Sequence, residues 1–285
     1  MTLVVIEKDD VIYSGRVRDE RVSVLGQEDL SSRLCDLAGF AKQSEIGEPL
    51  DLVDVRILQP ILRPGKILGI GLNYAAHAAE SVSFISNKSP GVQKWFNKQA
   101  TAANGPFDPV HLPKISKQLD YEGELVVIIG KRGRHVPEDR AMELVAGFTC
   151  GCDYSVRDWQ KASPTMIMGK GFDTHAPFGP FLVPASEIED WRAFEISTFV
   201  NGDLRQSAQA GDMTFSIAQQ ISHLSAAFTL EPGDVIFTGT PAGVGAGYQP
   251  PRWLCDGDRV RVEITGLGAL ENEIIHEPET TRVLK

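Results

Sequence analysis

Apolar residues gather in short runs bounded by turn residues, and this pattern constrains the fold of the chain more than any other feature. The runs at residues 66–71, 125–130, 195–200 and 260–264 each have the length of a strand. They do not alternate regularly with helical segments, so we do not expect a doubly wound parallel sheet. No run approaches the ~20 apolar residues of a transmembrane helix, and charged residues interrupt the N-terminus too early for a signal peptide. The pattern predicts a β-rich α+β fold with no membrane partner.

Turn-forming residues near position 62 divide the chain into two predicted domains. Pro60, Pro64 and Gly65 follow one another closely there. The preceding residues combine short strand-like runs with one amphipathic segment and contain no cluster of chemically capable side chains. We therefore expect a small N-terminal α+β domain over residues 1–62 and a catalytic domain over residues 63–285.

Helical periodicity is confined to a few segments. Residues 29–42 carry Leu and Phe at helical spacing, which predicts one amphipathic helix. Residues 137–146 begin with Pro and are followed by Gly, which predicts a second helix. Residues 212–228 predict a third helix, with Asp212 as its N-cap. The dipeptide Asn201-Gly202 predicts a β-hairpin, because both residues tolerate positive φ.

The charge balance and the cysteines bear on partners and compartment. Acidic residues number 38 and basic residues 28, and the net charge of −10 repels phosphate backbones. We therefore expect no nucleic-acid partner. The 4 cysteines are too few and too irregular for a disulfide framework, and Cys150 and Cys152 have no second pair at zinc spacing. Small buried cysteines in a reducing compartment are predicted, and with them a cytoplasmic location.

Two glutamates stand at the head of the most apolar run. If residues 121–127 form a strand, Glu122 and Glu124 point to the same face, and Gly123 between them allows another backbone to approach closely. Two adjacent carboxylates repel each other and need a shared cation, a shared proton or open solvent. On these residues alone, a metal site and a solvated strand edge are equal alternatives.

A second polar group follows the apolar run at 145–150. Asp153 is predicted to cap the next helix, which places Arg157 and Gln160 on the helical face that it shares. An acid, a planar guanidinium and an amide on one face suit a small carboxylate ligand. A capped helix with a local salt bridge is the alternative.

Two further positions have the residue types of acid–base and oxyanion chemistry. His77 and Glu80 lie three residues apart in an alanine-rich segment, where a helix lets the carboxylate orient the imidazole as a general base. Lys170 lies between Gly169 and Gly171, and a lysine held by tight backbone can stabilise a developing oxyanion. The alternatives are an ordinary surface pair and a solvated lysine.

Two glycine-rich segments do not match nucleotide-binding motifs. Residues 238–245 lack the Gly-Lys-Ser/Thr end of a phosphate-binding loop. The segment that begins at Gly69 lacks the third glycine of a dinucleotide fingerprint. We therefore reject nucleotide binding. Thr240 still offers a hydroxyl and a backbone N–H to a carboxylate.

These segments together resemble the fumarylacetoacetate hydrolase family over roughly residues 63–274. So many matches in the same order are specific for the family, although not for a substrate. The resemblance implies a mixed β-sandwich or β-roll, a small preceding domain and a homodimer. The matching stretches lie at residues 71–80, 120–124, 126–130, 153–158, 169–174, 200–203, 230–234 and 238–245.

The resemblance also implies the functional residues. Glu122, Glu124 and Asp153 would bind a divalent metal, normally Mg2+ and in some relatives Mn2+ or Ca2+. Carboxylates without sulfur or imidazole are the ligands that such hard cations prefer, so chemistry and resemblance agree. His77 and Glu80 match the water-activating pair of the hydrolases. The positions that surround the substrate are matched by Lys170, Arg157, Gln160 and Thr240.

These expectations combine into a metal-dependent hydrolase that cleaves a C–C bond of a 2,4-dioxo acid. An acylpyruvate or a 2,4-diketo-3-deoxy sugar acid would yield pyruvate and a carboxylic acid. In this hypothesis His77 activates water, and the metal with Lys170 stabilises the pyruvate enolate.

Other activities use the same 2-oxo acid site without added water, namely an oxaloacetate decarboxylase or a hydroxy-dienoate isomerase. A binding protein without activity is a further alternative, although every charged position of the motifs is filled. Residues 83–113 match the family more loosely and are expected to shape the pocket. Cys152, where many relatives have Asn, is expected to affect only the surroundings of the metal.

Overall fold

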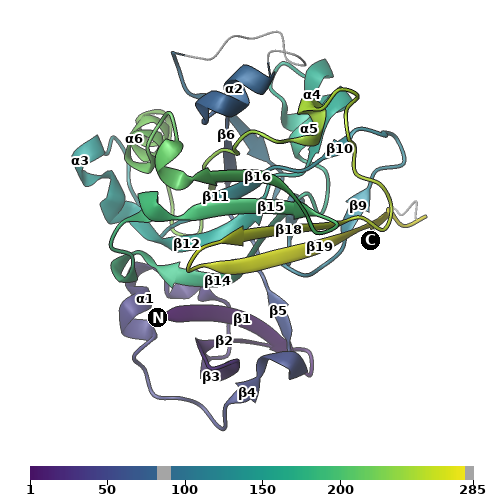
Figure 1. Cartoon of the computed structure of the whole chain (residues 1–285). Coiled ribbons are helices and arrows are strands. Elements are labelled where there is room, and N and C mark those ends of the chain that lie inside the picture. Colours follow the sequence, from purple (N-terminus) through teal and green to yellow (C-terminus); the bar gives the residue numbers. More distant parts are fainter. Residues whose placement is uncertain (82–90, 280–285) are drawn as a thin grey trace, which may run out of the picture.

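The structure is a computed structural model that describes residues 1–81 and 91–279 (Figure 1). It is rich in strands, as the apolar runs predicted. The strands are β1 (Thr2–Lys8), β2 (Val11–Arg18), β3 (Arg21–Gly26), β4 (Leu50–Asp51), β5 (Arg56–Leu58), β6 (Ile67–Gly71), β7 (Lys94–Lys98), β8 (Ala103–Asn104), β9 (Val110–Leu112), β10 (Leu119–Asp120), β11 (Gly123–Ile129), β12 (Val145–Cys152), β13 (Ser155–Val156), β14 (Ala176–Pro184), β15 (Glu195–Val200), β16 (Asp203–Gln209), β17 (Val235–Phe237), β18 (Arg259–Ile264) and β19 (Gly268–His276). The α-helices are α1 (Leu37–Phe40), α2 (Ala75–Ser81), α3 (Glu138–Ala141), α4 (Arg157–Ala162), α5 (Ile167–Lys170) and α6 (Ile217–Ala227).

One large mixed sheet runs through both predicted domains. Its strands follow the order β4-β3-β2-β1-β14-β12-β11-β17-β6-β7. β1 pairs antiparallel with β14, with Leu3 opposite Leu182, so the N-terminal strands extend the sheet of the larger region. β17 pairs in parallel with β6 and antiparallel with β11. The two regions on either side of residue 62 therefore share a sheet.

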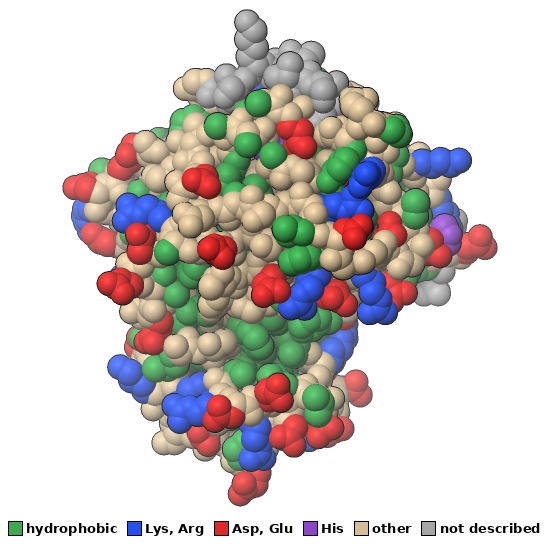
Figure 2. All heavy atoms as spheres, viewed as in Figure 1, with side chains coloured by type: hydrophobic (Ala, Val, Ile, Leu, Met, Phe, Trp, Pro, Cys, Tyr) green, Lys and Arg blue, Asp and Glu red, His purple; other side chains and the backbone are tan. Residues whose placement is uncertain are grey.

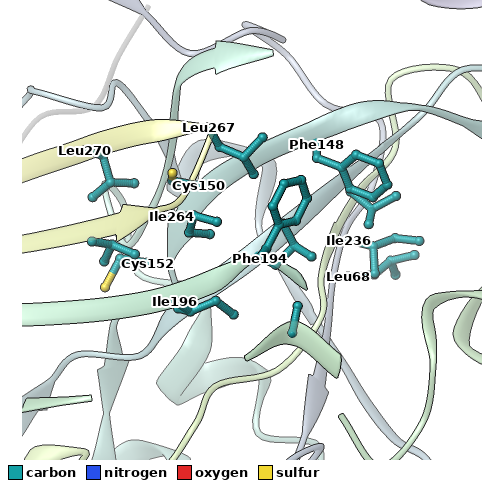
Figure 3. Close-up of a cluster of buried hydrophobic side chains, with 14 of the residues drawn as sticks. Leu68, Phe148, Cys150, Cys152, Phe194, Ile196, Ile236, Ile264, Leu267 and Leu270 are labelled. Atoms are coloured by element: carbon teal, nitrogen blue, oxygen red, sulfur yellow. The ribbon is translucent and has the colours of Figure 1, made fainter. Parts of the chain in front are cut away.

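A second sheet packs on the first and encloses the main core (Figure 3). Its strands follow the order β16-β15-β18-β19-β9. The core joins Phe148 on β12 to Ile196 on β15 and Ile264 on β18, all of them buried. The rings of Phe148 and Phe194 meet edge to face, with centroids 5.8 Å apart. The predicted β-rich fold with mixed sheets is confirmed.

The first predicted helix is divided into short helical turns. Residues Leu30–Ser32 and Leu34–Asp36 form 3-10 turns, and α1 adds one further turn. Asp29 accepts a hydrogen bond from the Ser31 amide, and Asp36 accepts one from the Gly39 amide. Each aspartate thus starts a new turn and competes with a continuous helix. The prediction of one helix over 29–42 was wrong in this respect.

The third predicted helix begins later than expected. α6 starts after Ser216, whose hydroxyl accepts a hydrogen bond from the Gln219 amide, while the Gln219 side chain accepts one from the Ser216 amide. This reciprocal capping box satisfies two backbone donors. The carboxylate of Asp212 accepts a bond from the Gln209 amide instead. The prediction of Asp212 as the N-cap was therefore wrong.

Of the two other local predictions, the structure confirms the hairpin, and the second helix is shorter than predicted. Asn201 and Gly202 have φ values of 53° and 85° and join β15 to β16, which confirms the hairpin. The predicted helix over 137–146 is shorter, because α3 gives way to a 3-10 turn at Met142–Leu144 and strand β12 begins at Val145.

Helices α2, α4 and α5 lie together at the end of the molecule opposite the N-terminal strands (Figure 1). Of the loosely matching segment 83–113, residues 83–90 lie outside the described residues, and the remainder supplies β7, β8 and β9. Within 1–81 and 91–279, every helix is too short or too polar to cross a membrane.

Candidate active site

Glu122, Glu124 and Asp153 lie side by side where two paired strands meet. β11 and β12 are antiparallel, and Gly123 lies opposite Cys152, so the start of one strand meets the end of the other. One ligand oxygen from each carboxylate lies within 4.8 Å of the other two. All three side chains are buried, which excludes the solvated strand edge.

Buried cations surround this acidic triad. Lys170 Nζ lies 2.6 Å from Glu122 Oε2 and 2.5 Å from Asp153 Oδ2. Lys98 donates a hydrogen bond to the other oxygen of Asp153 and a second, at 3.1 Å, to the carbonyl of Tyr154. Lys170 and Lys98 are 2% and 4% exposed, so water screens these pairs only weakly. Lys170 is therefore part of the site and not a solvated lysine.

Glu124 is the member of the triad without an ion pair to a side chain among the described residues. Its Oε2 accepts a hydrogen bond from the Gly239 amide at 2.7 Å. Burial raises the pKa of Glu124 well above its ordinary value, and the charges of Asp153 and Glu122 raise it further. Burial acts on Glu122 too, but Lys170 and Arg157 outweigh it and hold the pKa of Glu122 below its ordinary value.

The donor set therefore fits a divalent metal. Three carboxylates supply oxygen ligands of the kind that Mg2+ and other hard cations prefer. A cation between them would also compensate the charge of Glu124 that no described side chain pairs. Glu122, Glu124 and Asp153 are thus the residues that would hold the ion.

Arg157 lies at the centre of a buried polar network. Its Nε donates to Asp120 Oδ2 at 2.8 Å, and its Nη1 donates to Gln160 Oε1 at 2.9 Å. Its Nη2 lies 2.7 Å from Glu122 Oε1. The structure thus places Arg157 and Gln160 beside the triad, as predicted.

The local structure that places Arg157 and Gln160 beside the triad differs from the prediction. α4 begins at Arg157, and Asp153 precedes it by a short strand, β13, which pairs with β10. This pairing holds the chain extended between Asp153 and the helix. Asp153 therefore does not cap α4, and the prediction that it shares a helical face with Arg157 was wrong.

His77 and Glu80 form a pair on α2, in which the imidazole is buried and the carboxylate is partly buried. His77 Nδ1 lies 3.2 Å from Glu80 Oε2, and His77 is 4% exposed. The Gly243 amide donates to both Glu80 oxygens, at 3.1 and 3.2 Å. Because Nδ1 faces the carboxylate, Nε2 is the nitrogen left to act on a ligand. An ordinary pair on a surface helix is excluded by the burial.

Thr240 is buried beside the first residue of β11. Its Oγ1 donates to the Gly123 carbonyl at 2.9 Å and accepts from Gln206 Nε2 at 2.7 Å. A Cβ at Gly123 would lie only 2.0 Å from Thr198 Oγ1. The glycine therefore makes room for a side chain of the second sheet and not, as predicted, for another backbone.

A cavity of about 660 Å³ joins these groups. Trp95, Phe96 and Met166 give it apolar walls, and Lys170 Nζ lies 4.7 Å from the centroid of the Phe96 ring. Glu80 contacts Nδ1 of His77 and does not itself line the cavity. The sequence-predicted residues that line the cavity are His77, Glu122, Arg157, Gln160, Lys170 and Thr240.

The sequence analysis did not predict a role for three polar residues of the site. Lys98 lies two residues after the buried Phe96, on the same face of β7. The alternation of faces along a strand could therefore have indicated that Lys98 is buried. Asp120 is the first residue of the matching stretch 120–124, but the sequence analysis assigned it no role. Gln206 is 1% exposed and pairs with Thr240 across a long sequence separation, which a single sequence does not reveal.

A β-rich fold with a buried acidic triad beside a cavity is the architecture of an enzyme with a small-molecule site. The chain belongs to the fumarylacetoacetate hydrolase family, because the family model "Fumarylacetoacetate (FAA) hydrolase C-terminal" matches residues 66–275. This confirms the family resemblance drawn from the motifs.

Similar proteins support the same assignment. The chain is 42% identical to the oxaloacetate tautomerase YisK of Bacillus subtilis over 243 residues, which cover 84% of this chain and 80% of that protein. It is also 42% identical to the mitochondrial oxaloacetate tautomerase FAHD2B of Bos taurus, over 78% of this chain and 70% of that protein.

Solved structures of the same fold include enzymes with different activities. A fumarylacetoacetate hydrolase of Exiguobacterium antarcticum superposes with a TM-score of 0.84 at 34% identity, covering 97% of this chain and 100% of the other. A 5-carboxymethyl-2-hydroxymuconate delta-isomerase of Mycobacterium smegmatis superposes with a TM-score of 0.81 at 33% identity and the same coverage.

Proposed function

We propose that the protein interconverts the keto and enol forms of a 2-oxo dicarboxylic acid of the oxaloacetate type. The observation that carries this proposal is the placement of His77, paired with Glu80, on the same cavity that Glu122 of the acidic triad lines. A base beside a cation-binding triad suits removal of the acidic proton next to a 2-oxo group. The names of the relatives that share 42% identity agree with it.

The residues of the chain divide the reaction between them. A bound divalent cation would supply Lewis-acid stabilisation of the substrate's 2-oxo group. His77 removes a proton from C3, and the C3–H electron pair becomes the C2–C3 double bond as negative charge moves to the C2 oxygen. Lys170 stabilises this charge. The protonated His77 then returns the proton to the C2 oxygen, which completes the enol.

Other residues bind and orient the substrate in this proposal. Arg157 and Gln160 face the cavity and offer side-chain N–H groups to the carboxylate next to the 2-oxo group. Thr240 offers its backbone N–H, because its hydroxyl already donates to the Gly123 carbonyl. Glu80 holds the tautomer of His77 that leaves Nε2 unprotonated. The apolar wall formed by Trp95, Phe96 and Met166 restricts water around the reacting atoms.

The activity is tested with oxaloacetate and Mg2+. The decay of the enol absorbance should be faster with the enzyme than with Mg2+ alone, and EDTA should abolish the difference. A rate equal to that of Mg2+ alone would contradict the proposed function.

Hydrolysis of a 2,4-dioxo acid is the second candidate, and the size of the cavity favours it. About 660 Å³ falls within the ~300–1,000 Å³ of pockets that enclose drug-sized ligands, so carbon chains longer than that of oxaloacetate fit. In this reaction His77 deprotonates a water that attacks C4, and C3 leaves as the enolate of pyruvate. Pyruvate release from a panel of acylpyruvates, with Mg2+ and with EDTA, distinguishes this candidate from tautomerisation.

Two lysines at the cavity are evidence that the substrate has a second carboxylate. Lys94 and Lys161 line the cavity, and neither has an ion-pair partner among the described residues. Lys161→Ala should therefore raise KM for oxaloacetate, by about two- to fivefold, because an exposed ion pair contributes ~0.2–1 kcal/mol. Affinity for oxalate, which lacks a distal carboxylate, should stay unchanged in calorimetry.

The control for this variant is Lys131→Ala, which removes another exposed lysine that does not line the cavity. An equal rise of KM in both variants would show an effect of overall charge. It would contradict a specific contact with Lys161.

A homodimer belongs to the same proposal. Figure 2 shows hydrophobic side chains gathered around β1, where Tyr13, Ile57 and Phe181 are only partly buried. Apolar patches of this kind are typical of interaction surfaces. Static light scattering at micromolar concentration should give twice the chain mass of 31.1 kDa, and a single-chain mass would contradict the dimer.

A further inference from the structure

One loop donates backbone hydrogen bonds to three carboxylates that belong to different parts of the site. The Gly239 amide donates to Glu124 at 2.7 Å, and the Gly243 amide donates to Glu80 at 3.1 Å. The Gly245 and Ala246 amides donate to Asp120 at 2.7 and 3.0 Å. The same loop carries Thr240. The glycine-rich segment, which lacks the end of a phosphate-binding loop, therefore binds carboxylates of its own chain.

The Asp120 carboxylate accepts four hydrogen bonds. Its Oδ1 accepts from the amides of Tyr121 and Gly245, and its Oδ2 accepts from the amide of Ala246 and from Arg157 Nε. It is 0% exposed, so no water competes with these four donors. Four hydrogen bonds fix the orientation of the Asp120 carboxylate, and they also fix the positions of the groups that donate them.

The approach of the loop to Asp120 depends on glycine. A Cβ at Gly245 would lie 2.6 Å from Asp120 Oδ1 and 2.2 Å from the Arg252 carbonyl. Both distances are far below van der Waals contact. The chain thus keeps a residue without a side chain at the position where the loop meets the carboxylate.

Asp120 connects two groups that face the cavity from different elements. Arg157 comes from α4, and Thr240 comes from the loop after β17. The Asp120 carboxylate accepts hydrogen bonds both from the Arg157 guanidinium and from the Gly245 and Ala246 amides of the loop. The separation between these two substrate-binding groups therefore depends on one buried side chain that does not itself line the cavity.

We propose that Asp120 is a positioning residue that sets Arg157 and the Thr240 loop at the spacing needed to bind the carboxylate of a 2-oxo acid. This inference rests on the proposed function, because it assigns Arg157 and Thr240 to the substrate carboxylate. Asp120 contacts Arg157, and Arg157 in turn pairs with the metal ligand Glu122. Loss of the Asp120 carboxylate should weaken substrate binding more than turnover.

Asp120→Asn tests this role at constant side-chain volume. The amide NH2 would face at least one of the donors that the carboxylate accepts from, so part of the network breaks. A hydrogen bond to a charged group contributes ~1.5–3 kcal/mol, so affinity for oxalate in the presence of Mg2+ should fall by roughly tenfold or more. KM for oxaloacetate at saturating Mg2+ should rise by a similar factor, while kcat changes by less than about threefold.

Asp234→Asn is the matched control. Asp234 is also buried, at 1% exposure, pairs with Lys66 at 2.7 Å, and accepts the Glu231 amide at 2.8 Å. It precedes β17, whereas the Thr240 loop follows that strand. The control should lower the melting temperature without changing oxalate affinity.

The outcomes separate the inference from the proposed function. Unchanged oxalate affinity in Asp120→Asn, or an equal loss in Asp234→Asn, would overturn the role of Asp120. Wild-type protein that binds no oxalate with Mg2+ would overturn the proposed function and the substrate role with it. If Asp120→Asn does not fold, Asp120→Glu keeps the charge and displaces the carboxylate. It should show the same selective loss of oxalate affinity.

Discussion

His77→Ala should lower kcat for the 2-oxo acid by ~10²–10⁴-fold, the usual contribution of a positioned general base. The substitution removes the imidazole, while Lys170 keeps its contacts with Glu122 and Asp153. Oxalate needs no proton transfer, so its affinity in the presence of Mg2+ should change little. Stopped-flow absorbance for the enol and calorimetry for oxalate measure the two effects separately.

The controls for His77 separate its chemical role from its place in the framework of the site. His223→Ala removes an exposed histidine on α6 and should leave both measurements unchanged. A loss of oxalate affinity together with activity in His77→Ala would place the imidazole among the groups that shape the pocket. Unchanged kcat would contradict the assignment of His77 as the base. If acylpyruvate hydrolysis falls while tautomerisation persists, His77 activates water and the second candidate function is the correct one.

Glu124→Gln should raise the dissociation constant for Mg2+ by at least ~100-fold. Loss of an outer-shell partner of a ligand already costs ~10–100-fold in metal affinity, and here a ligand charge itself is removed. Activity should fall with the metal, and excess Mg2+ should restore part of it. Isothermal titration calorimetry measures the affinity. Wild-type affinity in this variant would contradict the three-carboxylate site.

Glu124→Gln should weaken metal binding, but it should not destabilise the metal-free protein. The pKa of Glu124 is raised by burial and by the charges of Asp153 and Glu122, so its ionisation at neutral pH costs folding free energy. Gln removes that cost and can still accept the hydrogen bond from the Gly239 amide. In EDTA the melting temperature of Glu124→Gln should therefore be at least that of the wild type. Glu143→Gln, at an exposed pair with Arg140, is the control and should change neither quantity.

Several features of the site were already contained in local sequence patterns. The period of two placed Glu122 and Glu124 on one side of an apolar strand, and the i, i+3 spacing placed Glu80 beside His77. The motifs identified the family, whose C-terminal model matches residues 66–275. These inferences succeeded because each depends on residues a few positions apart, where the backbone geometry alone sets the distance.

Local patterns failed where neighbouring residues compete for the same backbone. Asp29 and Asp36 each start a separate turn, so hydrophobic periodicity alone overestimated the first helix. Asp212 was chosen as an N-cap although the reciprocal pair Ser216 and Gln219 lay a few residues further on.

Only the tertiary structure decided how the parts of the site meet. Asp153 reaches the glutamates through the pairing of β12 with β11, and Lys98 and Lys170 reach Asp153 from two further segments. Asp120 was invisible as a functional residue because its partners Arg157 and Gly245 lie 37 and 125 residues away. The sequence by itself determined the strand-rich fold, the family and the residue types of the chemistry. The folded chain decided which cation pairs with which carboxylate, because such contacts depend on strand register and burial that no short-range pattern encodes.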